Sequence, residues 1–339
     1  MVSENFTPPA PPIGVIESLT SGFDTVVNRL YLILIPVVVD VILWLGPRIS
    51  YKQALRVFGT PDLGIQFGEG FQRLLFPLSP EQYFHPMSAT QYLPALAMPS
   101  VLNSRDAAQL PFALTPPVWS IPTFAGMLLL FLGSLQIGLI VLVPYLGLIA
   151  QAVNHNPIDW RGLLRRSLLI IGQVLAIEGV VAVPLFFCLV LVVPEMFVGA
   201  PTDPGKVSLL IIPIVIFASL WLTVSVLLSF TIHSMLLNNR NVLGSMWDSM
   251  RVVQWNMPAT LALLALVSVI FLGMQVVWRL ADPGSWITLA AIGGNAFIST
   301  GLAAATFVFF KDRYRYWSEF REQLIAELER RRVSQDRRN

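Results

Sequence analysis

Two carboxylates stand inside apolar stretches of the sequence, where ionisable side chains are rare. Asp40 lies in the stretch 30–46 and Glu178 in the stretch 167–193. With the rise per residue of an α-helix, Asp40 lies about 15 Å and Glu178 about 16 Å from the start of its stretch. The two acids are therefore predicted to lie at similar depth.

Two amides are predicted near the same depth, Gln136 in the stretch 122–150 and Asn295 in the stretch 286–310. Because a medium of low dielectric constant disfavours an unpaired carboxylate, the acids need a partner or must be neutral. As neutral acids they would bond to Gln136, Asn295 or Gln173 and join helices, contributing about 0.6 to 2 kcal/mol each. Alternatively, they line a wet cavity and exchange a proton or bind a cationic substrate.

Six long apolar stretches position these side chains. They occupy residues 30–46, 122–150, 167–193, 207–232, 258–278 and 286–310. About 20 mostly apolar helical residues cross a hydrocarbon core, and all but the first stretch meet that length easily. The composition agrees, with 55% hydrophobic and only 12% charged residues. The sequence therefore predicts an all-α fold, a polytopic membrane bundle of six transmembrane helices.

A weak internal repeat predicts how these helices are arranged. Residues 21–28 (SGFDTVVN) and residues 249–256 (SMRVVQWN) each precede an apolar stretch with the same Ser-to-Asn spacing, and residues 159–187 form a looser third copy. Each copy begins with a short cytoplasmic amphipathic helix, at residues 13–29 in the first. We expect three helical hairpins in parallel orientation, although equal Ser-to-Asn spacing also arises by chance.

Basic residues predict the orientation. Arginines lie in segments 151–166 and 233–257 and in the tail after Phe310, whereas segments 194–206 and 279–285 carry one basic residue each. By the positive-inside rule, both termini are cytoplasmic. The sequence thus predicts a multi-pass protein of a bacterial cytoplasmic membrane.

Residues 47–121 form the longest predicted connection, an extracytoplasmic loop rich in proline and aromatic residues. We interpret this loop as a cap over the bundle, or equally as a docking face for another membrane protein, because it is apolar for an exposed segment.

The tail 311–339 is predicted to be a charged cytoplasmic helix that leaves the membrane and lies along its surface, or equally a solvated end that only fixes the topology. It is a second candidate contact for another membrane protein. Aromatic residues near its start and arginines near its end are predicted to meet membrane lipids at the interface. These residues are Tyr314, Tyr316, Trp317, Arg330, Arg331 and Arg332.

Signatures of catalysis are missing from the sequence. His85, His155 and His233 are scattered without HExxH spacing, and neither a GxxxxGK[ST] phosphate loop nor a GxSxG elbow is present. Metal ligands are not clustered, and no cofactor motif is found. The net charge of +2 with dispersed basic residues gives no footprint for nucleic acid. We therefore expect a protein that is not an enzyme and has no metal or cofactor.

Two segments carry a resemblance to known proteins, LLNNRNVLGSMWDSMRVVQWNMPATLALLALV at 236–267 and the opening at 12–50. They are similar to a recurring element of uncharacterised bacterial six-helix membrane proteins, including the membrane domain attached to some glycerophosphodiester phosphodiesterases. The resemblance covers the helices and not the long loop. It implies the six-helix plan, and it does not imply phosphodiesterase activity, because no such domain occurs in this sequence.

Two functions are compatible with these features. The first is a structural or accessory subunit that interacts with other membrane proteins or lipids. The alternative is a small transporter or permease that uses the midplane carboxylates for proton or cation coupling. A transporter needs a central polar cavity open to one side and reached by both acids, whereas an accessory subunit needs a dry bundle and an apolar outer face.

Overall fold

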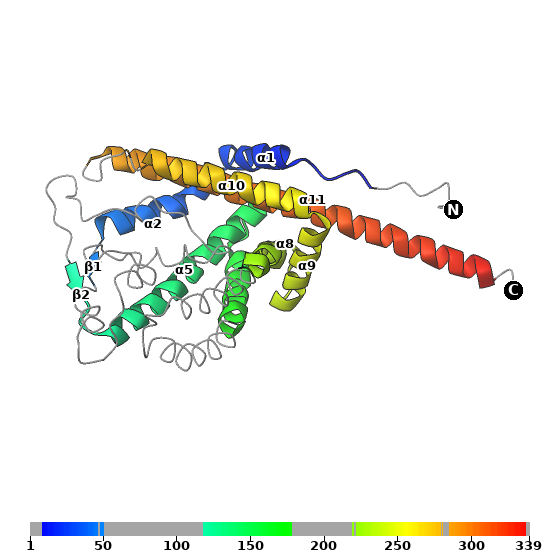
Figure 1. Ribbon diagram of the computed structural model, residues 1–339, viewed down its shortest axis with the longest axis horizontal. Coiled ribbons are helices and arrows are strands. Elements are labelled where there is room, and N and C mark those ends of the chain that lie inside the picture. The colour runs from blue at the N-terminus through cyan, green and yellow to red at the C-terminus, as the bar shows by residue number, and fades with distance from the viewer. Residues whose placement is uncertain are drawn as a thin grey trace, which may run out of the picture.

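The computed structural model is mostly helical, as the sequence predicts, with one pair of three-residue strands among the residues that it describes. The described residues are 9–46, 48–50, 118–177, 219, 222–278, 280 and 285–336. Figure 1 shows the helices gathered around one long helix, α11, which runs past them toward the C-terminus.

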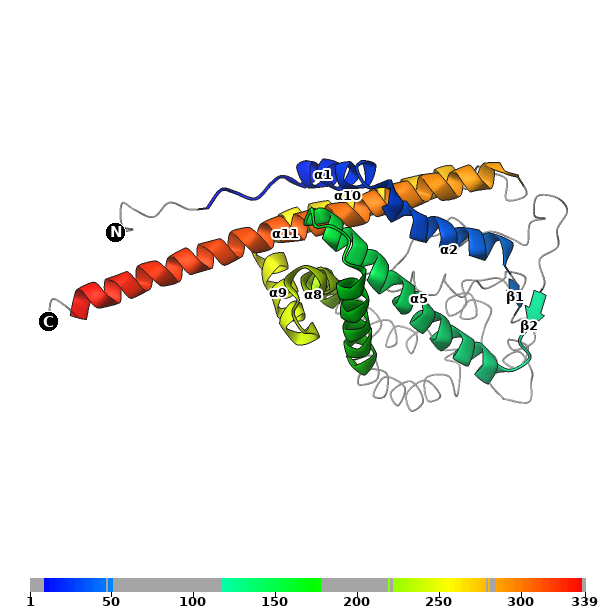
Figure 2. The ribbon, with the colours of Figure 1, turned by 180° about the vertical axis from the view of Figure 1, so that it is seen from behind.

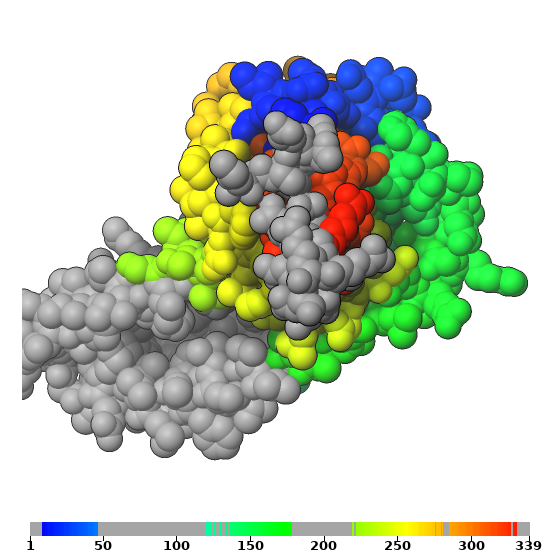
Figure 3. All heavy atoms as spheres, turned by 90° about the vertical axis from the view of Figure 1, so that its right-hand side faces the viewer, coloured from blue at the N-terminus to red at the C-terminus, as the bar shows by residue number. Residues whose placement is uncertain are grey.

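Helix α11 (Ile287–Asp336) has 50 residues and is the axis of the bundle. It contacts α1 (Val15–Val27), α2 (Leu34–Leu45), α5 (Phe124–Val153), α8 (Thr231–Asn238), α9 (Val242–Trp255) and α10 (Met257–Trp278). Phe307, Phe309 and Phe310 are all fully buried, and neighbouring positions on a helix point in different directions, so this part is covered on several sides. Figure 3, seen from the C-terminal side, shows α11 in orange and red between the blue N-terminal helices, yellow α9 and α10 and green residues 160–177.

The second half of α11 contains residues 311–336 of the predicted charged tail, and how this tail lies relative to a membrane stays a prediction. The helix continues without a break through Lys311 to Asp336, and Figure 2 shows its end extending away from the other helices. The sequence changes from apolar to polar at Lys311, but its helix propensity stays high. Residues after Phe310 include neither Gly nor Pro and are rich in Arg, Glu, Gln and Leu, all good helix formers.

The chain before the first predicted span packs lengthwise against α11. Helix α1 (Val15–Val27) runs antiparallel to α11, since Ile13 bonds to Asp312 while Phe23 contacts Phe297. A Cβ atom on Gly22 would lie 2.4 Å from the backbone nitrogen of Ala305. Only glycine permits this approach, which explains a small residue on the packed face of α1.

A short 3₁₀ helix, η1 (Leu30–Ile33), leads from α1 into α2 (Leu34–Leu45). The axis of α1 makes an angle of 92° with the segment Leu30–Leu45. The amphipathic helix predicted at 13–29 and the apolar stretch at 30–46 are thus two separate helical pieces joined by a sharp bend.

Helix α5 (Phe124–Val153) begins where the Thr123 side chain accepts a hydrogen bond from the Gly126 amide, at 3.1 Å. Its second half supplies much of the main hydrophobic core, including Ile149. The Tyr145 hydroxyl lies 2.8 Å from the Thr300 hydroxyl of α11. Because Thr300 donates to the Ala296 carbonyl, Tyr145 is the donor of that bond.

A second group of helices covers another side of α11. Residues 160–177 are helical, and α8 (Thr231–Asn238), α9 (Val242–Trp255) and α10 (Met257–Trp278) follow in the chain. Asn239 takes a left-handed conformation with φ of 53° and ends α8. The Asn241 side chain then accepts from the Gly244 amide at 3.1 Å and starts α9.

Two short strands join the ends of the long loop predicted at 47–121. Strand β1 (Arg48–Ser50) pairs in parallel with β2 (Val118–Ser120), with Ile49 opposite Trp119. This pairing fixes where the loop leaves and rejoins the helices. Residues 51–117 lie outside the described part of the chain, and the predicted cap or docking face stays a prediction.

By length and composition, three of the described helices could cross a membrane. They are α5 at Gln136–Val153, α10 and α11, and the bent pair of α1 with Leu30–Leu45 would make a fourth. The apolar helices thus agree with a membrane protein. Most of the predicted spans 167–193 and 207–232 lies outside the described residues, so the number of six and the three hairpins stay predictions.

Candidate functional site

Asp40 is buried where α2 packs against α11, with an exposed fraction of 2%. Leu43 and Trp44, about one turn further along α2, form a hydrophobic cluster with Ala291 and Ile292 of α11. Residues three and four apart share a helix face. Asp40 therefore faces the neighbouring helix rather than an open surface.

Asn295 lies at the same contact, about one turn beyond Ile292 on α11, and is also 2% exposed. Two of the four residues predicted for an intramembrane site are thus buried between α2 and α11. Gln136 is half-buried on α5. Glu178 lies outside the described residues.

The aromatic residues predicted for the membrane interface pack around the start of the second half of α11. Tyr314 lies 5.7 Å from Phe310 and 5.9 Å from Trp317, measured between ring centroids. The Arg251 guanidinium of α9 lies 5.2 Å from the Trp317 ring. Trp317 therefore also joins α9 to α11, a role that the sequence pattern did not predict.

The arginines predicted to meet lipid lie near the end of α11. Arg330 is exposed, and Arg331 and Arg332 continue the helix. At the rise of an α-helix, Arg330 stands about 30 Å along the axis from Phe310. Their contact with lipid stays a prediction.

A buried polar cluster that sequence reasoning missed lies between α8 and α9. The Asp248 carboxylate is 3% exposed, accepts a 2.9 Å hydrogen bond from the Ser234 hydroxyl and lies 3.3 Å from the Arg240 guanidinium. The neighbouring Ser249 hydroxyl donates to the Leu227 carbonyl at 2.7 Å and accepts from the Phe230 amide at 3.0 Å. The adjacent polar residues Asp248 and Ser249 were the available sequence signal for this cluster.

Arg166 completes this group, which we call the Asp248 cluster (Arg166, Ser234, Arg240, Asp248 and Ser249). Its guanidinium donates to the carbonyls of Met235 at 2.6 Å and Arg240 at 2.9 Å, near the end of α8, where carbonyls lack helical partners. Burial lowers the pKa of Arg166. The cluster ties the segment after α5 to the α8–α9 connection.

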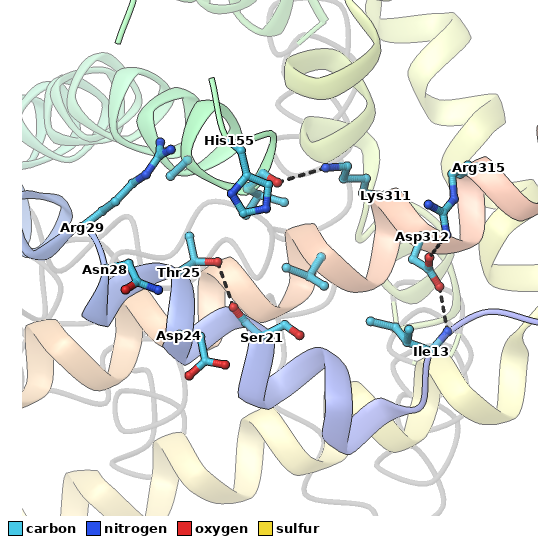
Figure 4. A pocket seen from close by; sticks show the side chains of 13 residues that line it. Ile13, Ser21, Asp24, Thr25, Asn28, Arg29, His155, Lys311, Asp312 and Arg315 are labelled. Atoms are coloured by element: carbon cyan, nitrogen blue, oxygen red, sulfur yellow. Dashed lines mark hydrogen bonds and ion pairs between the residues drawn. The ribbon is translucent and has the colours of Figure 1, made fainter. Parts of the chain in front are cut away.

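A cavity of about 390 Å³ opens at a different place, between α1, the C-terminal end of α5 and α11. Figure 4 shows the polar side chains around it. Helix α1 lines it with Ser21, Asp24 and Thr25, followed by Asn28 at the helix end. The carboxylate of Asp24 makes no hydrogen bond or ion pair within the described part of the chain.

Four basic side chains line the same cavity, Arg29, His155, Lys311 and Arg315. The Lys311 ammonium donates to the Val153 carbonyl at 3.0 Å, and the Arg29 guanidinium donates to the Asn156 carbonyl at 3.1 Å. Both carbonyls belong to the end of α5 or the turn after it, where the helix dipole is negative. His155 has a φ of 55°, in the left-handed region that commonly follows a helix end.

Asp312 and Arg313 hold the chain that enters α1. The Asp312 carboxylate accepts from the Ile13 amide at 2.7 Å and from Arg315 at 2.7 Å, and Arg313 donates to the Ile13 carbonyl at 3.3 Å. Arg313 also lies 3.4 Å from the centre of the Phe309 ring, and burial lowers its pKa to about 10. This contact fixes the N-terminal wall of the cavity.

The pKa of Lys311 is shifted by several opposing causes. Burial lowers the pKa of Lys311, and the nearby Arg315 lowers it further, while Asp312 opposes the shift. An anion bound beside Lys311 would relieve the repulsion between the two cations. Among the described residues, no group of three or more His, Cys, Asp and Glu side chains could hold a metal ion.

No family model, curated protein or solved structure matches this chain. The resemblance to the membrane domain of some glycerophosphodiester phosphodiesterases therefore stays a prediction.

Proposed function

We propose that this chain is a non-enzymatic integral membrane protein of a bacterial cytoplasmic membrane that serves as a structural or accessory subunit. It crosses the membrane six times with both termini in the cytoplasm, and it works with another membrane protein and the surrounding lipid.

The observation that carries this proposal is the outer face of α10. The helix has 22 residues and a mean hydropathy of 2.4, but only 12% of it is buried within the chain. Val269, Leu272 and Val276 are among its exposed side chains, whereas Leu263 is fully buried. An apolar face of this length requires lipid or a partner helix to cover it.

The position of the cavity favours this role over transport. Asp40 and Asn295 are buried between helices, and neither they nor Gln136 lines the cavity, which lies at the end of α5 rather than at the predicted midplane. For the described residues, this agrees with neutral side chains that join helices. Side chains that line an open wet site would be more exposed than Asp40 and Asn295, each of which is only 2% exposed.

Photo-crosslinking in native membranes tests the accessory role. Benzoylphenylalanine in place of Leu272 should give a discrete adduct with another protein, because Leu272 points away from the packed core. The same substitution of Leu263 is the matched control on the same helix, and it should give none, because Leu263 faces inward. Adducts with lipid alone at Leu272 would contradict a partner on this face.

Proton flux tests the alternative. The purified protein in liposomes, loaded with a pH-sensitive dye and given a membrane potential, should show no more proton flux than empty liposomes. Flux that disappears in Asp40→Asn, with the variant recovered in equal amount, would overturn the accessory role and support a transporter.

A further inference from the structure

The cavity lies where three predicted spans end. Arg29 stands directly before the stretch 30–46, His155 follows α5, and Lys311 follows the stretch 286–310 directly. Figure 4 shows side chains from these three places around one space. Ends of spans lie at the level of lipid headgroups, so under the membrane placement proposed above this cavity opens near a layer of phosphates.

The cations of the cavity keep donors for a ligand. The Lys311 ammonium carries three donors and the Arg29 guanidinium five, but each makes one hydrogen bond among the described residues, to a backbone carbonyl. A carbonyl bond neutralises no charge. These two side chains therefore retain both charge and hydrogen-bonding capacity.

The two acids that line the cavity, Asp24 and Asp312, form no ion pair with Arg29 or Lys311 among the described residues. Asp312 is engaged by the Ile13 amide and by Arg315, and its partial stabilisation of the Lys311 charge is outweighed by burial and by the repulsion from Arg315. Asp24 comes from α1 and is unpaired in the described part of the chain. On the other side of the cavity, the chain at the end of α5 supplies His155 and the carbonyls that hold Lys311 and Arg29 (Figure 4). The cavity thus has a cationic side next to α5.

We propose that this cavity binds the phosphate of a phosphoester anion, with Arg29 and Lys311 as its principal cationic contacts. Its volume of about 390 Å³ is within the range of small-molecule sites and holds a phosphoglycerol headgroup. The phosphoester belongs either to a membrane lipid or to a soluble molecule, and the two sources share the same recognition chemistry.

Equilibrium dialysis of the detergent-solubilised full chain tests this site with two radiolabelled probes, dihexanoyl phosphatidylglycerol and inorganic phosphate. Arg29→Gln and Lys311→Gln should each weaken binding of the recognised probe about tenfold, as expected when a charge-assisted contact is lost. Arg165→Gln is the matched control, because Arg165 is an exposed arginine of the same predicted cytoplasmic side and does not line the cavity.

Asp24→Asn separates ligand recognition from loss of structure. Lys311→Gln also removes a contact with the end of α5 and could unfold the chain, whereas the Asp24 side chain has no polar partner to lose among the described residues. Removing its negative charge should strengthen binding of the recognised probe about threefold, because repulsion with the phosphate disappears. A damaged protein does not bind more tightly.

Each outcome decides the proposal. Phosphatidylglycerol binding that follows this variant pattern assigns the site to a lipid headgroup, and the same pattern with inorganic phosphate alone assigns it to a soluble phosphoester. Binding that is absent with both probes, or that Arg165→Gln reduces as much as Lys311→Gln does, overturns the site. Such a failure leaves the α10 crosslinks and the proton-flux result unaffected, so it is distinguishable from failure of the accessory role.

Discussion

The Asp248 cluster and the cavity are both rich in charge, and both lie beside helix ends, but their polar groups are used differently. In the cluster, the Asp248 carboxylate is closed off by Ser234 and Arg240. In the cavity, Asp24 has no polar partner within the described residues, and each of Lys311 and Arg29 makes one bond to a carbonyl. Buried polar groups are ordinarily satisfied, which fits the cluster as a structural joint. The charged side chains of the cavity are exposed or half-buried, so water can take their spare hydrogen bonds and a ligand can replace that water.

The comparison predicts that the Asp248 cluster dominates stability. Asp248→Ala should lower the free energy of unfolding by about 2 to 3 kcal/mol, because Ser234 loses its buried acceptor and Arg240 loses its partner. Denaturation of the detergent-solubilised protein by sodium dodecyl sulfate measures this change. Glu322→Ala, at an exposed position of α11, should change stability by less than about 0.5 kcal/mol. Equal effects would remove the distinction between the two regions.

Helix α1, which forms one wall of the cavity, can be displaced by a substitution that changes no charged residue. Gly22→Ala should cost about 1 to 3 kcal/mol and move α1 away from α11, since its new Cβ would meet the backbone of Ala305. Gly172→Ala is the matched control, because a Cβ there meets nothing within 4 Å; it should be neutral or stabilise the helix by up to about 1 kcal/mol. Thermal unfolding measures both, and a harmless Gly22→Ala would refute the close α1–α11 contact.

Alkaline pH should sharpen the comparison through Lys311. Its pKa lies below the ordinary 10.5, mainly through burial and next through Arg315, with Asp312 opposing. Raising the pH through this lowered pKa removes the positive charge that binds the anion. Arg29, Arg315, His155, Asp24 and Asp312 are the other titratable groups around the cavity.

Binding of dihexanoyl phosphatidylglycerol, whose phosphate keeps one charge over this range, should therefore fall about tenfold between neutral pH and pH values above the Lys311 pKa, the loss of one charge-assisted contact. Lys311→Arg should remove most of this alkaline loss, because arginine stays protonated. An unchanged pH profile in Lys311→Arg would exclude Lys311 as the titrating contact.

The smallest expected effect concerns the connection between α8 and α9, next to the Asp248 cluster. Asn241→Ala removes the acceptor for the Gly244 amide at the start of α9 and should cost about 1 kcal/mol. Asn241→Asp keeps that acceptor and adds a negative charge at the helix N-terminus, so it should be tolerated. Because the cavity lies elsewhere, phosphate binding should be unchanged in both variants, and a change in binding would show that the two regions are coupled.

The presence of the apolar helices could be predicted from the sequence, because a long apolar stretch such as 258–278 has few alternatives to a helix. A helical tail after Phe310 was predicted as well, but the apolar pattern did not show that this tail continues the preceding helix without a break; that continuation past Lys311 depends on helix propensity. The contact of Gly22 with Ala305 joins residues far apart in the chain, and no local pattern specifies it.

The candidate sites were predicted unevenly. Asp40 and Asn295 stood out because polar residues are rare in apolar stretches, and both proved buried at one helix contact. The cavity was missed, because Arg29, His155 and Lys311 are single residues at the ends of different stretches. Their common position at predicted span ends was a usable signal, but their meeting at one place depends on how α1 and α5 pack around α11.

The parallel pairing of β1 with β2 has a consequence for the length of the segment between them. Since the two strands run in the same direction, the chain that leaves at Ser50 must travel back to the opposite end of the pair before it re-enters at Val118. A tight hairpin turn cannot make that return, which ordinarily takes a dozen or more residues. Shortening residues 51–117 therefore has a lower limit, below which the two adjoining helices α2 and α5 would lose their shared anchor.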